Sequence, residues 1–305
     1  MGYKKVKFNI PKEIKAFLFL IRELGFNMKK TQQLIAREAL ICNKKAVLTP
    51  SELISGEVEI SLFEPETKGL KPIFIAKNFA IFDKPSSVLV HPTTINATYS
   101  LLDEVKFHLG KDANITHRID LETSGVVIAS KNLKSEIKIK TLFEQKKIKK
   151  RYLALVRGKL SKSLLIDSKI AINSDLSKSK EKVFISENGK SAKTEIEPIE
   201  YFPSLDATLI RAYPKTGRTH QIRIHLHSIN HTILGDPLYG QSFEFSSKYL
   251  DKVLSKKERL ETIKANRLML HSDLVEFRLN EIDYRIESKS GLKSEIDSLL
   301  KLKLN

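Results

Sequence analysis

The spacing of hydrophobic residues near the N-terminus predicts two short helices. After Pro11, a residue favoured in the first turn of a helix, apolar residues recur at the helical period until Gly25, which favours a helix end. A second helix is expected from about residue 31 to residue 40, with its apolar side facing a core. Three basic residues at this helix are expected to point outward: Lys29, Lys30 and Arg37.

Two strand-like runs follow, at residues 46–48 and 58–62, separated by Pro50 and Gly56. The stretch from residue 64 to residue 72 is polar and rich in Pro, Gly and Lys, which is typical of a linker. The pattern therefore predicts a small first domain at residues 11–65, built from two helices and a β-hairpin.

Beyond the linker, short apolar or alternating runs predict a larger domain at residues 72–290. A wholly apolar run at Val126–Ala129 is typical of a buried strand, and alternating patterns with turns continue through residues 161–212. Leu101–Leu109 is expected to be a helix, and residues 241–266 a polar helical insertion. We expect an α+β fold with a mixed, mostly antiparallel sheet flanked by helices, and a helical tail at residues 291–305.

Charge changes this picture by indicating a partner. The 305-residue chain has a formal net charge of +17 and a pI near 9.7, and such basic proteins commonly bind a polyanion. A lysine-rich proteome is the alternative explanation. Between Lys131 and Lys162 twelve residues are basic and two are acidic, more than an ordinary solvated helix requires, so we expect phosphate contacts there.

Cysteine and histidine content argues against disulfides and metals. Cys42 is the single cysteine, so no internal disulfide can form, which favours a reducing, cytoplasmic location. The apolar run Phe17–Ile21 is too short for a signal core or a membrane span. Four histidines fall between His220 and His231, but their spacing fits no standard zinc site, so no metal is expected.

The first strong motif is His117-Arg118-Ile119-Asp120, which places a carboxylate in a loop just before the buried strand. An aspartate before a turn can simply cap its own backbone. Together with Thr123-Ser124-Gly125, however, the motif is similar to the HRLD-x-x-TSG signature of the RluA/RluD-type pseudouridine synthases.

Four further blocks carry the resemblance. Residues 84–92 match a KPxGxxVHP loop, with Ser87 where glycine is usual, so a positive φ there would be strained. Residues 216–226 match TGRTHQIRxHL, residues 235–240 match GDxLYG, and residues 267–271 match a closing R-x-x-LH strand. The resemblance thus covers nearly all of residues 72–280 in five ordered blocks.

The resemblance implies isomerisation of uridine to pseudouridine in RNA, by cleavage of the N1–C1′ bond, rotation of the base and joining of C5 to C1′. No atoms enter or leave, so no cofactor is implied. Asp120 matches the catalytic carboxylate, acting either as a nucleophile at C1′ or as the base at C2′, and the sequence does not choose between them. Arg223 would keep Asp120 ionised, with a phosphate contact as the alternative, and Tyr152 would stack on the uracil and assist removal of the C5 proton.

RNA contacts are implied at further positions. Arg118 would fill the place of the extruded base, or form a structural salt bridge instead. Thr123, Arg218 and His220 lie in the matched motifs and are expected to contact RNA. The first domain loosely resembles the S-four RNA-binding domain shared with a small-subunit ribosomal protein, so Lys29, Lys30 and Arg37 are also expected to bind RNA, with a solvated helix face as the alternative.

Family members with such an appended domain commonly modify large-subunit ribosomal RNA, which is therefore the expected partner, with transfer RNA second. We expect a monomer with no membrane partner. Two other classes stay open: a non-catalytic RNA-binding or ribosome-assembly factor, and a hydrolase that releases uracil.

Overall fold

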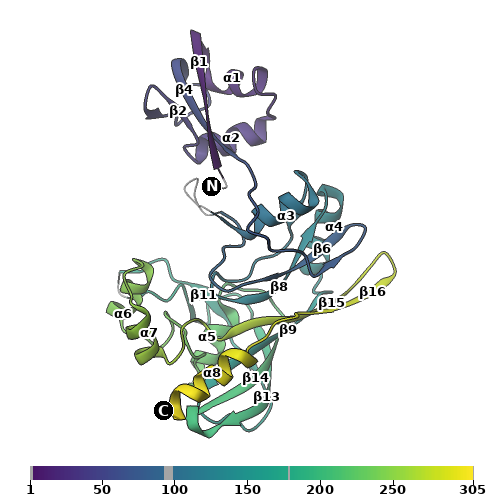
Figure 1. The fold of residues 1–305 in the computed structure, drawn as a ribbon, viewed down its shortest axis with the longest axis vertical. Helices are drawn as coiled ribbons and strands as arrows, with labels where there is room; N and C mark the ends of the chain where they lie inside the picture. The colour runs from purple at the N-terminus through teal and green to yellow at the C-terminus, as the bar shows by residue number, and fades with distance from the viewer. Residues whose placement is uncertain (1–2, 93–98, 178, 305) are drawn as a thin grey trace. The chain divides into compact units, whose positions relative to one another are not determined.

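The computed structural model describes residues 3–92, 99–177 and 179–304 of the chain (Figure 1). The chain divides into two compact units. The first comprises Met1–Leu70 and Leu89–Lys111, and the second Lys71–Val88 and Asp112–Asn305.

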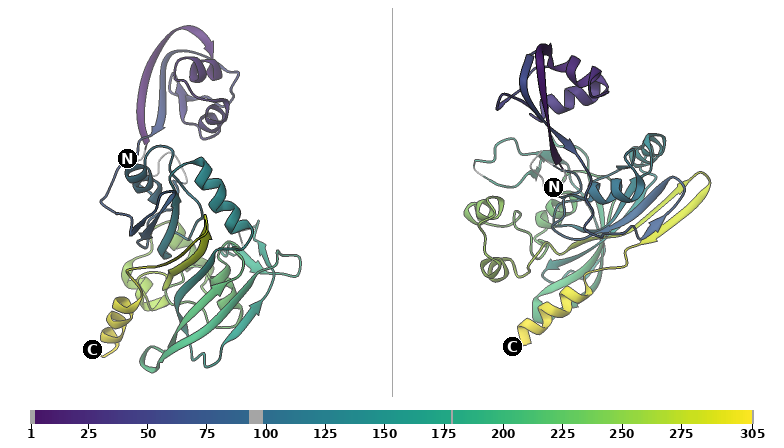
Figure 2. Two further views of the ribbon diagram at one scale, coloured as in Figure 1. Left: turned by 90° about the vertical axis from the view of Figure 1, so that its right-hand side faces the viewer. Right: turned by 45° about the horizontal axis from the view of Figure 1, so that its top comes forward.

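The first unit contains a four-stranded antiparallel sheet in the order β1-β4-β2-β3. Two helices pack on one face of this sheet around a core that includes Leu20, Leu40 and Ile60 (Figure 2). A third helix, α3, begins after Ser100 with a capping box. The elements are β1 (Tyr3–Lys15), α1 (Ala16–Arg22), α2 (Met28–Ala36), β2 (Leu40–Cys42), β3 (Lys45–Ala46), β4 (Leu53–Phe63) and α3 (Leu101–Leu109).

The prediction of a helix starting at Pro11 is wrong, because Pro11 lies inside β1 and α1 begins five residues later, at Ala16. Residues 3–10 pair with β4, and the register shifts between Ile10 and Ile14. Since β1 is an edge strand, Pro11 needs no ladder hydrogen bond at this irregularity. The second predicted helix is present as α2, and its three predicted cations are exposed.

The second unit is organised around a sheet to which ten of the described strands belong. Its main path runs β10-β13-β14-β9-β15-β8-β6-β5, with β16 paired to β15 and β7 to β8. The β8–β15 pair is parallel and the remaining pairs are antiparallel, so the prediction of a mixed, mostly antiparallel sheet is confirmed. The strands are β5 (Phe74–Ile75), β6 (Phe79–Lys84), β7 (Asn114–Ile115), β8 (Ser124–Ser130), β9 (Lys149–Arg157), β10 (Leu164–Asp167), β13 (Lys193–Phe202), β14 (Ala207–Pro214), β15 (Leu270–Leu279) and β16 (Ile282–Glu287).

Helices and a small hairpin flank this sheet. The hairpin formed by β11 (Ile170–Ile172) and β12 (Val183–Ile185) packs against the helix that begins within the GRTHQIR motif, through a cluster that includes Ile224 and Tyr239. Figure 1 shows α6 and α7 side by side at the left of the view, with α5 nearer the centre. The helices are α4 (Leu133–Glu144), α5 (Gln221–Ser228), α6 (Phe243–Leu250), α7 (Lys256–Ile263) and α8 (Lys293–Leu304), with a short 3-10 turn, η1 (Pro203–Leu205).

The middle strands of the sheet hold the candidate site. Every residue of β8 is buried, as the apolar run at Val126–Ala129 predicts. The loop that carries Asp120 leaves β7 and returns directly into β8, while α5 begins just after β14. The loop before β8 and the loop between β14 and α5 both contribute residues to one pocket.

Candidate active site

The loop that presents Asp120 is fastened to the strand that follows it. The backbone N–H and the hydroxyl of Thr116 both donate to the Ile128 carbonyl, at 3.0 and 2.9 Å. The Ile128 N–H donates to Nε2 of His117 at 3.0 Å. Burial lowers the pKa of His117 to about 3, so this ring is neutral at physiological pH and acts as an acceptor. The histidine of the first motif is therefore a structural anchor, and Asp120 stands three residues beyond it.

A buried lysine fixes the far side of the same loop. The ammonium of Lys84, which has no exposed surface, donates to the carbonyls of Pro85, Val88 and Leu121 at 2.8–2.9 Å. Ser87 also donates its backbone N–H to Leu121 at 3.0 Å, from a φ of +65°. Ser87 therefore adopts the left-handed conformation, which is strained for a residue other than glycine.

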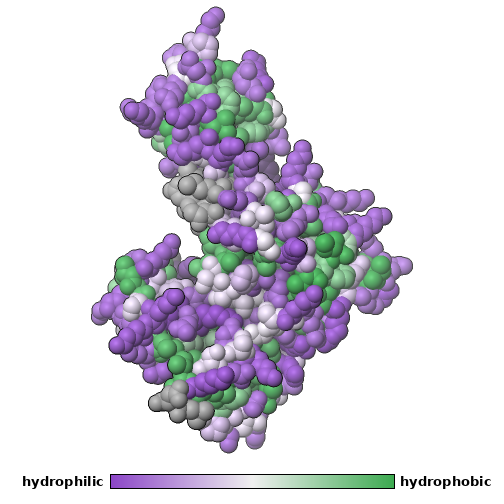
Figure 3. Space-filling view, in the orientation of Figure 1, coloured by the Kyte–Doolittle hydropathy of each residue, from purple (hydrophilic) through white to green (hydrophobic). Residues whose placement is uncertain are grey.

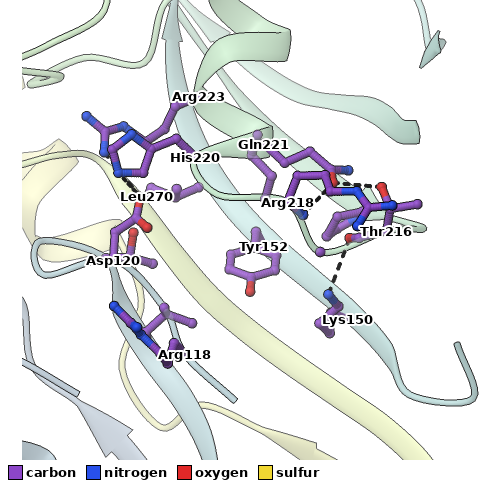
Figure 4. Close-up of a pocket in the computed structure, with 15 residues that line it drawn as sticks. Arg118, Asp120, Lys150, Tyr152, Thr216, Arg218, His220, Gln221, Arg223 and Leu270 are labelled. Carbon is purple, nitrogen blue, oxygen red and sulfur yellow. Dashed lines mark hydrogen bonds and ion pairs between the residues drawn. The ribbon is translucent and has the colours of Figure 1, made fainter. Parts of the chain in front are cut away.

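One arginine joins two carboxylates behind the site (Figure 4). Arg223 on α5 donates from Nε and Nη2 to the two oxygens of Asp236, at 2.8 Å each, and from Nη1 to Oδ2 of Asp120 at 3.2 Å. The predicted ion pair between Arg223 and Asp120 is therefore present. Burial alone would raise the pKa of Asp236, but Arg223 and the backbone N–H groups of Leu238 and Tyr239 outweigh it and lower that pKa. The buried pair with Asp236 holds the guanidinium in place for Asp120.

His220 forms the second neighbour of Asp120. Its Nε2 lies 3.8 Å from Oδ2 of Asp120, and its Nδ1 lies 2.9 Å from the buried Tyr239 hydroxyl. The backbone N–H of Val183 hydrogen-bonds to the Tyr239 oxygen, which leaves the phenol hydrogen for Nδ1 of His220. Burial lowers the pKa of His220 to about 4, so the ring is neutral and its proton is placed on Nε2, toward Asp120.

The floor of the pocket comes from β9. Figure 4 shows the Tyr152 ring between Asp120 on one side and Lys150 on the other. The exposed fraction of Tyr152 is 8%, and burial raises its pKa to about 12. Burial lowers the pKa of Lys150, whose Nζ has one acceptor among the described residues, the Thr216 carbonyl at 3.5 Å.

The loop before α5 closes the remaining side. Gln221 holds it by accepting from the Thr216 hydroxyl at 2.7 Å and the Arg218 N–H at 3.0 Å, while its amide donates to the Lys193 carbonyl. His220, with a φ of +51°, caps the N-terminus of α5 in the left-handed conformation.

The structure brings seven of the predicted site residues together. The side chain of Asp120 retains a 27% exposed fraction, so it is reachable from solvent, and Arg118 is exposed. The other three predicted residues, Lys29, Lys30 and Arg37, are in the first unit and do not line this pocket. The seven that line it are Arg118, Asp120, Thr123, Tyr152, Arg218, His220 and Arg223.

Sequence reasoning gave no role to several side chains that shape this pocket. Asp236 and Tyr239 belong to the GDPLYG block, and its match to a family pattern could have indicated that they belong to the site. Lys84 and Lys150 lie within or beside matched motifs, but a lysine in a basic chain is not distinctive. Burial distinguishes Lys84 and Lys150 from the other lysines, and the order of residues alone does not show it.

Two further features bear on the kind of chemistry. Within residues 3–92, 99–177 and 179–304, no group of three or more His, Cys, Asp or Glu side chains could hold a metal ion. No helix of the described chain is long and apolar enough to cross a membrane.

Among the described residues that line the pocket, one partly exposed carboxylate lies beside an arginine, a tyrosine ring and several cations, an arrangement suited to acid–base or nucleophilic chemistry on an anionic substrate. The chain matches the model of the RNA pseudouridylate synthase family over residues 78–228. An uncharacterised RNA pseudouridine synthase of Helicobacter pylori J99 is 40% identical over 94% of this chain and 96% of its own length. The chain belongs to the RNA pseudouridine synthase family, of the RluA/RluD type, and is an isomerase.

Other relatives agree with this assignment. A protein of Nitrosomonas europaea named ribosomal large subunit pseudouridine synthase D is 34% identical over 62% of this chain and 56% of its own length. Among solved structures, human RNA pseudouridylate synthase domain containing 1 covers 78% of this chain and 98% of its own, with a TM-score of 0.57 and 20% identity. That likeness supports the fold.

Proposed function

We propose that Asp120 is the catalytic carboxylate of this pseudouridine synthase. The observation that carries the proposal is its position: a partly exposed carboxylate in the pocket, paired with Arg223 at 3.2 Å and facing the space beside the Tyr152 ring. Either known route needs one ionised carboxylate at the sugar, to attack C1′ or to take the C2′ proton. A second carboxylate, as in a hydrolytic glycosidase, is not needed.

Arg223 orients Asp120 through this ion pair. Because Nε and Nη2 are already committed to Asp236, only Nη1 is available to Asp120, which fixes the direction from which the ion pair forms. Asp120 keeps its second oxygen, Oδ1, for the ribose.

Tyr152 acts by stacking on the uracil while the base turns. Its raised pKa of about 12 leaves the phenol protonated at neutral pH, so the ring supplies a flat apolar surface and the hydroxyl supplies a hydrogen bond. Removal of the C5 proton by a phenolate would require ionising this buried group first. The raised pKa of Tyr152 therefore favours the stacking role over the proton-removing role.

The target nucleotide reaches this pocket only after leaving its stack in the RNA. Arg118 is exposed at the rim, where a planar cation can stack on the bases beside the vacated position. Arg218 is exposed on the loop before α5, and the buried Thr123 hydroxyl has no partner among the described residues. These groups are the proposed RNA contacts of the pocket.

Large-subunit ribosomal RNA is the proposed substrate. In support, several relatives are named ribosomal large subunit pseudouridine synthase C or D, and the first unit, which we propose to be an RNA-binding module, carries exposed cations. Transfer RNA is the second candidate. Mapping pseudouridines in both RNA classes, in cells with and without the gene, separates the two.

The test of Asp120 uses RNA from cells lacking this protein, labelled with uridine tritiated at C5. Asp120→Asn should release tritium roughly 10³-fold more slowly than the wild type, because an amide neither attacks C1′ nor takes a proton. Its affinity for RNA should be nearly unchanged, since the side chain keeps its size and Arg223 keeps Asp236.

The same assay separates the other classes of protein. Isomerisation releases tritium into water, whereas hydrolysis releases labelled uracil and a binding protein releases neither. Full turnover by Asp120→Asn would remove the assignment of Asp120, whichever product forms.

A further inference from the structure

The residue two positions after Asp120 is held by a helix from the 241–266 region. Glu122 turns its carboxylate away from the pocket and is not among the lining residues. Arg259 on α7 donates from Nη1 to Oε1 of Glu122 at 2.8 Å and from Nη2 to Oε2 at 2.5 Å. Both side chains are nearly buried, with exposed fractions of 13% for Arg259 and 8% for Glu122.

The same arginine also reaches the loop that holds Asp236. Its Nη2 donates to the Gly235 carbonyl at 3.1 Å, one residue before Asp236. Gly235 has a φ of +75°, and a Cβ there would lie 1.8 Å from the Arg267 carbonyl oxygen, so the backbone of this loop lies directly against the segment that precedes β15. The guanidinium of Arg259 thus contacts both the loop that carries Asp120 and the loop that carries Asp236. These are the two carboxylates that pair with Arg223.

The Glu122 carboxylate also accepts hydrogen bonds from groups other than Arg259. The backbone N–H of Leu268 donates to its Oε2 at 2.9 Å, and Tyr249 of α6 also hydrogen-bonds to it. The Arg259 guanidinium carbon lies 5.5 Å from the Tyr249 ring centre. Removing one member of this buried ion pair would leave an uncompensated charge inside the protein.

We infer that Arg259 is a positioning residue for the isomerase reaction. It fixes the spacing of the Asp120 loop and the Asp236 loop, so that Arg223 can pair with both carboxylates at once. The helical segment α6–α7 then serves as a brace for the active site. This inference rests on the proposed role of Asp120.

The test compares maximal rate, KM and RNA affinity in the tritium-release assay, well below the unfolding temperature of each variant. Arg259→Ala should lower the maximal rate about 100-fold, while KM and the dissociation constant for RNA change less than about threefold, because no RNA-contacting group is removed. Methylguanidinium at millimolar concentration should restore a measurable part of the rate by filling the space left by the side chain. It should not restore the Glu122→Gln/Arg259→Ala double variant, which lacks the carboxylate that binds it.

Lys248→Met is the matched control. Lys248 also forms an ion pair between α6 and α7, with Glu258 at 3.2 Å, but the pair is about 40% exposed and touches neither loop. This variant should keep the wild-type rate. A rate loss in Arg259→Ala no larger than that of Lys248→Met, or a loss confined to RNA affinity, overturns the inference.

A milder variant covers the case in which Arg259→Ala does not fold. Arg259→Lys keeps the charge, but one ammonium cannot bind both oxygens of Glu122 and the Gly235 carbonyl in the same way, so the rate should fall about tenfold. A wild-type rate for this variant contradicts the inference. If Asp120→Asn is inactive while the Arg259 variants are fully active, only the positioning role of Arg259 is refuted. If Asp120→Asn is active, the proposed role of Asp120 is refuted.

Discussion

Lys84 illustrates how a single residue can set the shape of the site. Its side chain has no exposed surface. Its ammonium donates to the carbonyls of Pro85 and Val88, in the loop that follows it, and to the carbonyl of Leu121, next to Asp120. Three carbonyl acceptors match the three N–H groups of an ammonium, but burial opposes the charge and lowers the pKa from its ordinary value of 10.5 to about 7. Stability therefore depends on pH through this residue.

The sign of that dependence follows from proton binding. Between pH 7 and 10.5 the unfolded chain keeps the Lys84 proton and the folded chain releases it, so the cost of burying the charge is full below pH 7 and declines as pH rises. Relative to Lys84→Met, the wild type should gain about 2 kcal/mol of unfolding free energy between pH 6.5 and 9, at ~1.4 kcal/mol per unit. Denaturant unfolding of both proteins at the two pH values measures it, and a constant difference would contradict the lowered pKa.

At the scale of elements, the parallel contact between β8 and β15 brings the Asp120 loop close to the closing strand. Gly125 pairs with Ser272 there, has a φ of +109°, and a Cβ would lie 2.0 Å from the Ser272 carbonyl oxygen. The glycine of the first motif is thus required by the approach of two backbones, immediately after the loop that carries Asp120.

Gly125→Ala should therefore lower the free energy of unfolding by more than about 3 kcal/mol, since both the φ and the contact forbid a methyl group. Thermal or denaturant unfolding measures the change. Gly291→Ala is the control, because Gly291 has no atom within 4 Å of its Cβ position and no positive φ. If the two substitutions cost the same, close approach is not the reason for glycine at position 125.

Sequence predicted most of the elements and the central part of the site, for reasons visible in particular residues. The run at Val126–Ala129 and the helix at Leu101–Leu109 were predictable because burial and helical period leave a local pattern. Pro11 misled because its place in an edge strand depends on β4, more than forty residues away. The contact between Glu122 and Arg259 spans 137 residues, and no local pattern records it.

At the scale of the whole molecule, charge is the dominant feature. The net charge is +17, and hydrophilic residues predominate on the face shown in Figure 3. In the part of the chain that the structure describes, Lys29, Lys30 and Arg37 of the first unit are exposed and form no ion pair with a carboxylate. By contrast, three of the five lysines of β1 each pair with a glutamate of β4 or with the glutamate that follows it: Lys4, Lys5 and Lys7.

This difference predicts how RNA binding should respond to salt. Each phosphate contact contributes about 0.7–0.9 to the slope of log affinity against log salt concentration. Replacing Lys29, Lys30 and Arg37 together with glutamine should lower the slope by about 2 and weaken RNA binding, while the maximal rate of tritium release at saturating RNA stays unchanged because the pocket is intact.

The matched control replaces the same amount of charge in the same unit. Lys4, Lys5 and Lys7 already have glutamate partners at 2.6–3.3 Å, so they release few counterions from RNA, and their replacement with glutamine should leave the slope nearly unchanged. Filter binding at several salt concentrations measures both slopes. If both triple variants lower the slope of log affinity against log salt concentration by the same amount, net charge governs the affinity for RNA. The exposed residues of α2 would then form no dedicated RNA-contacting face.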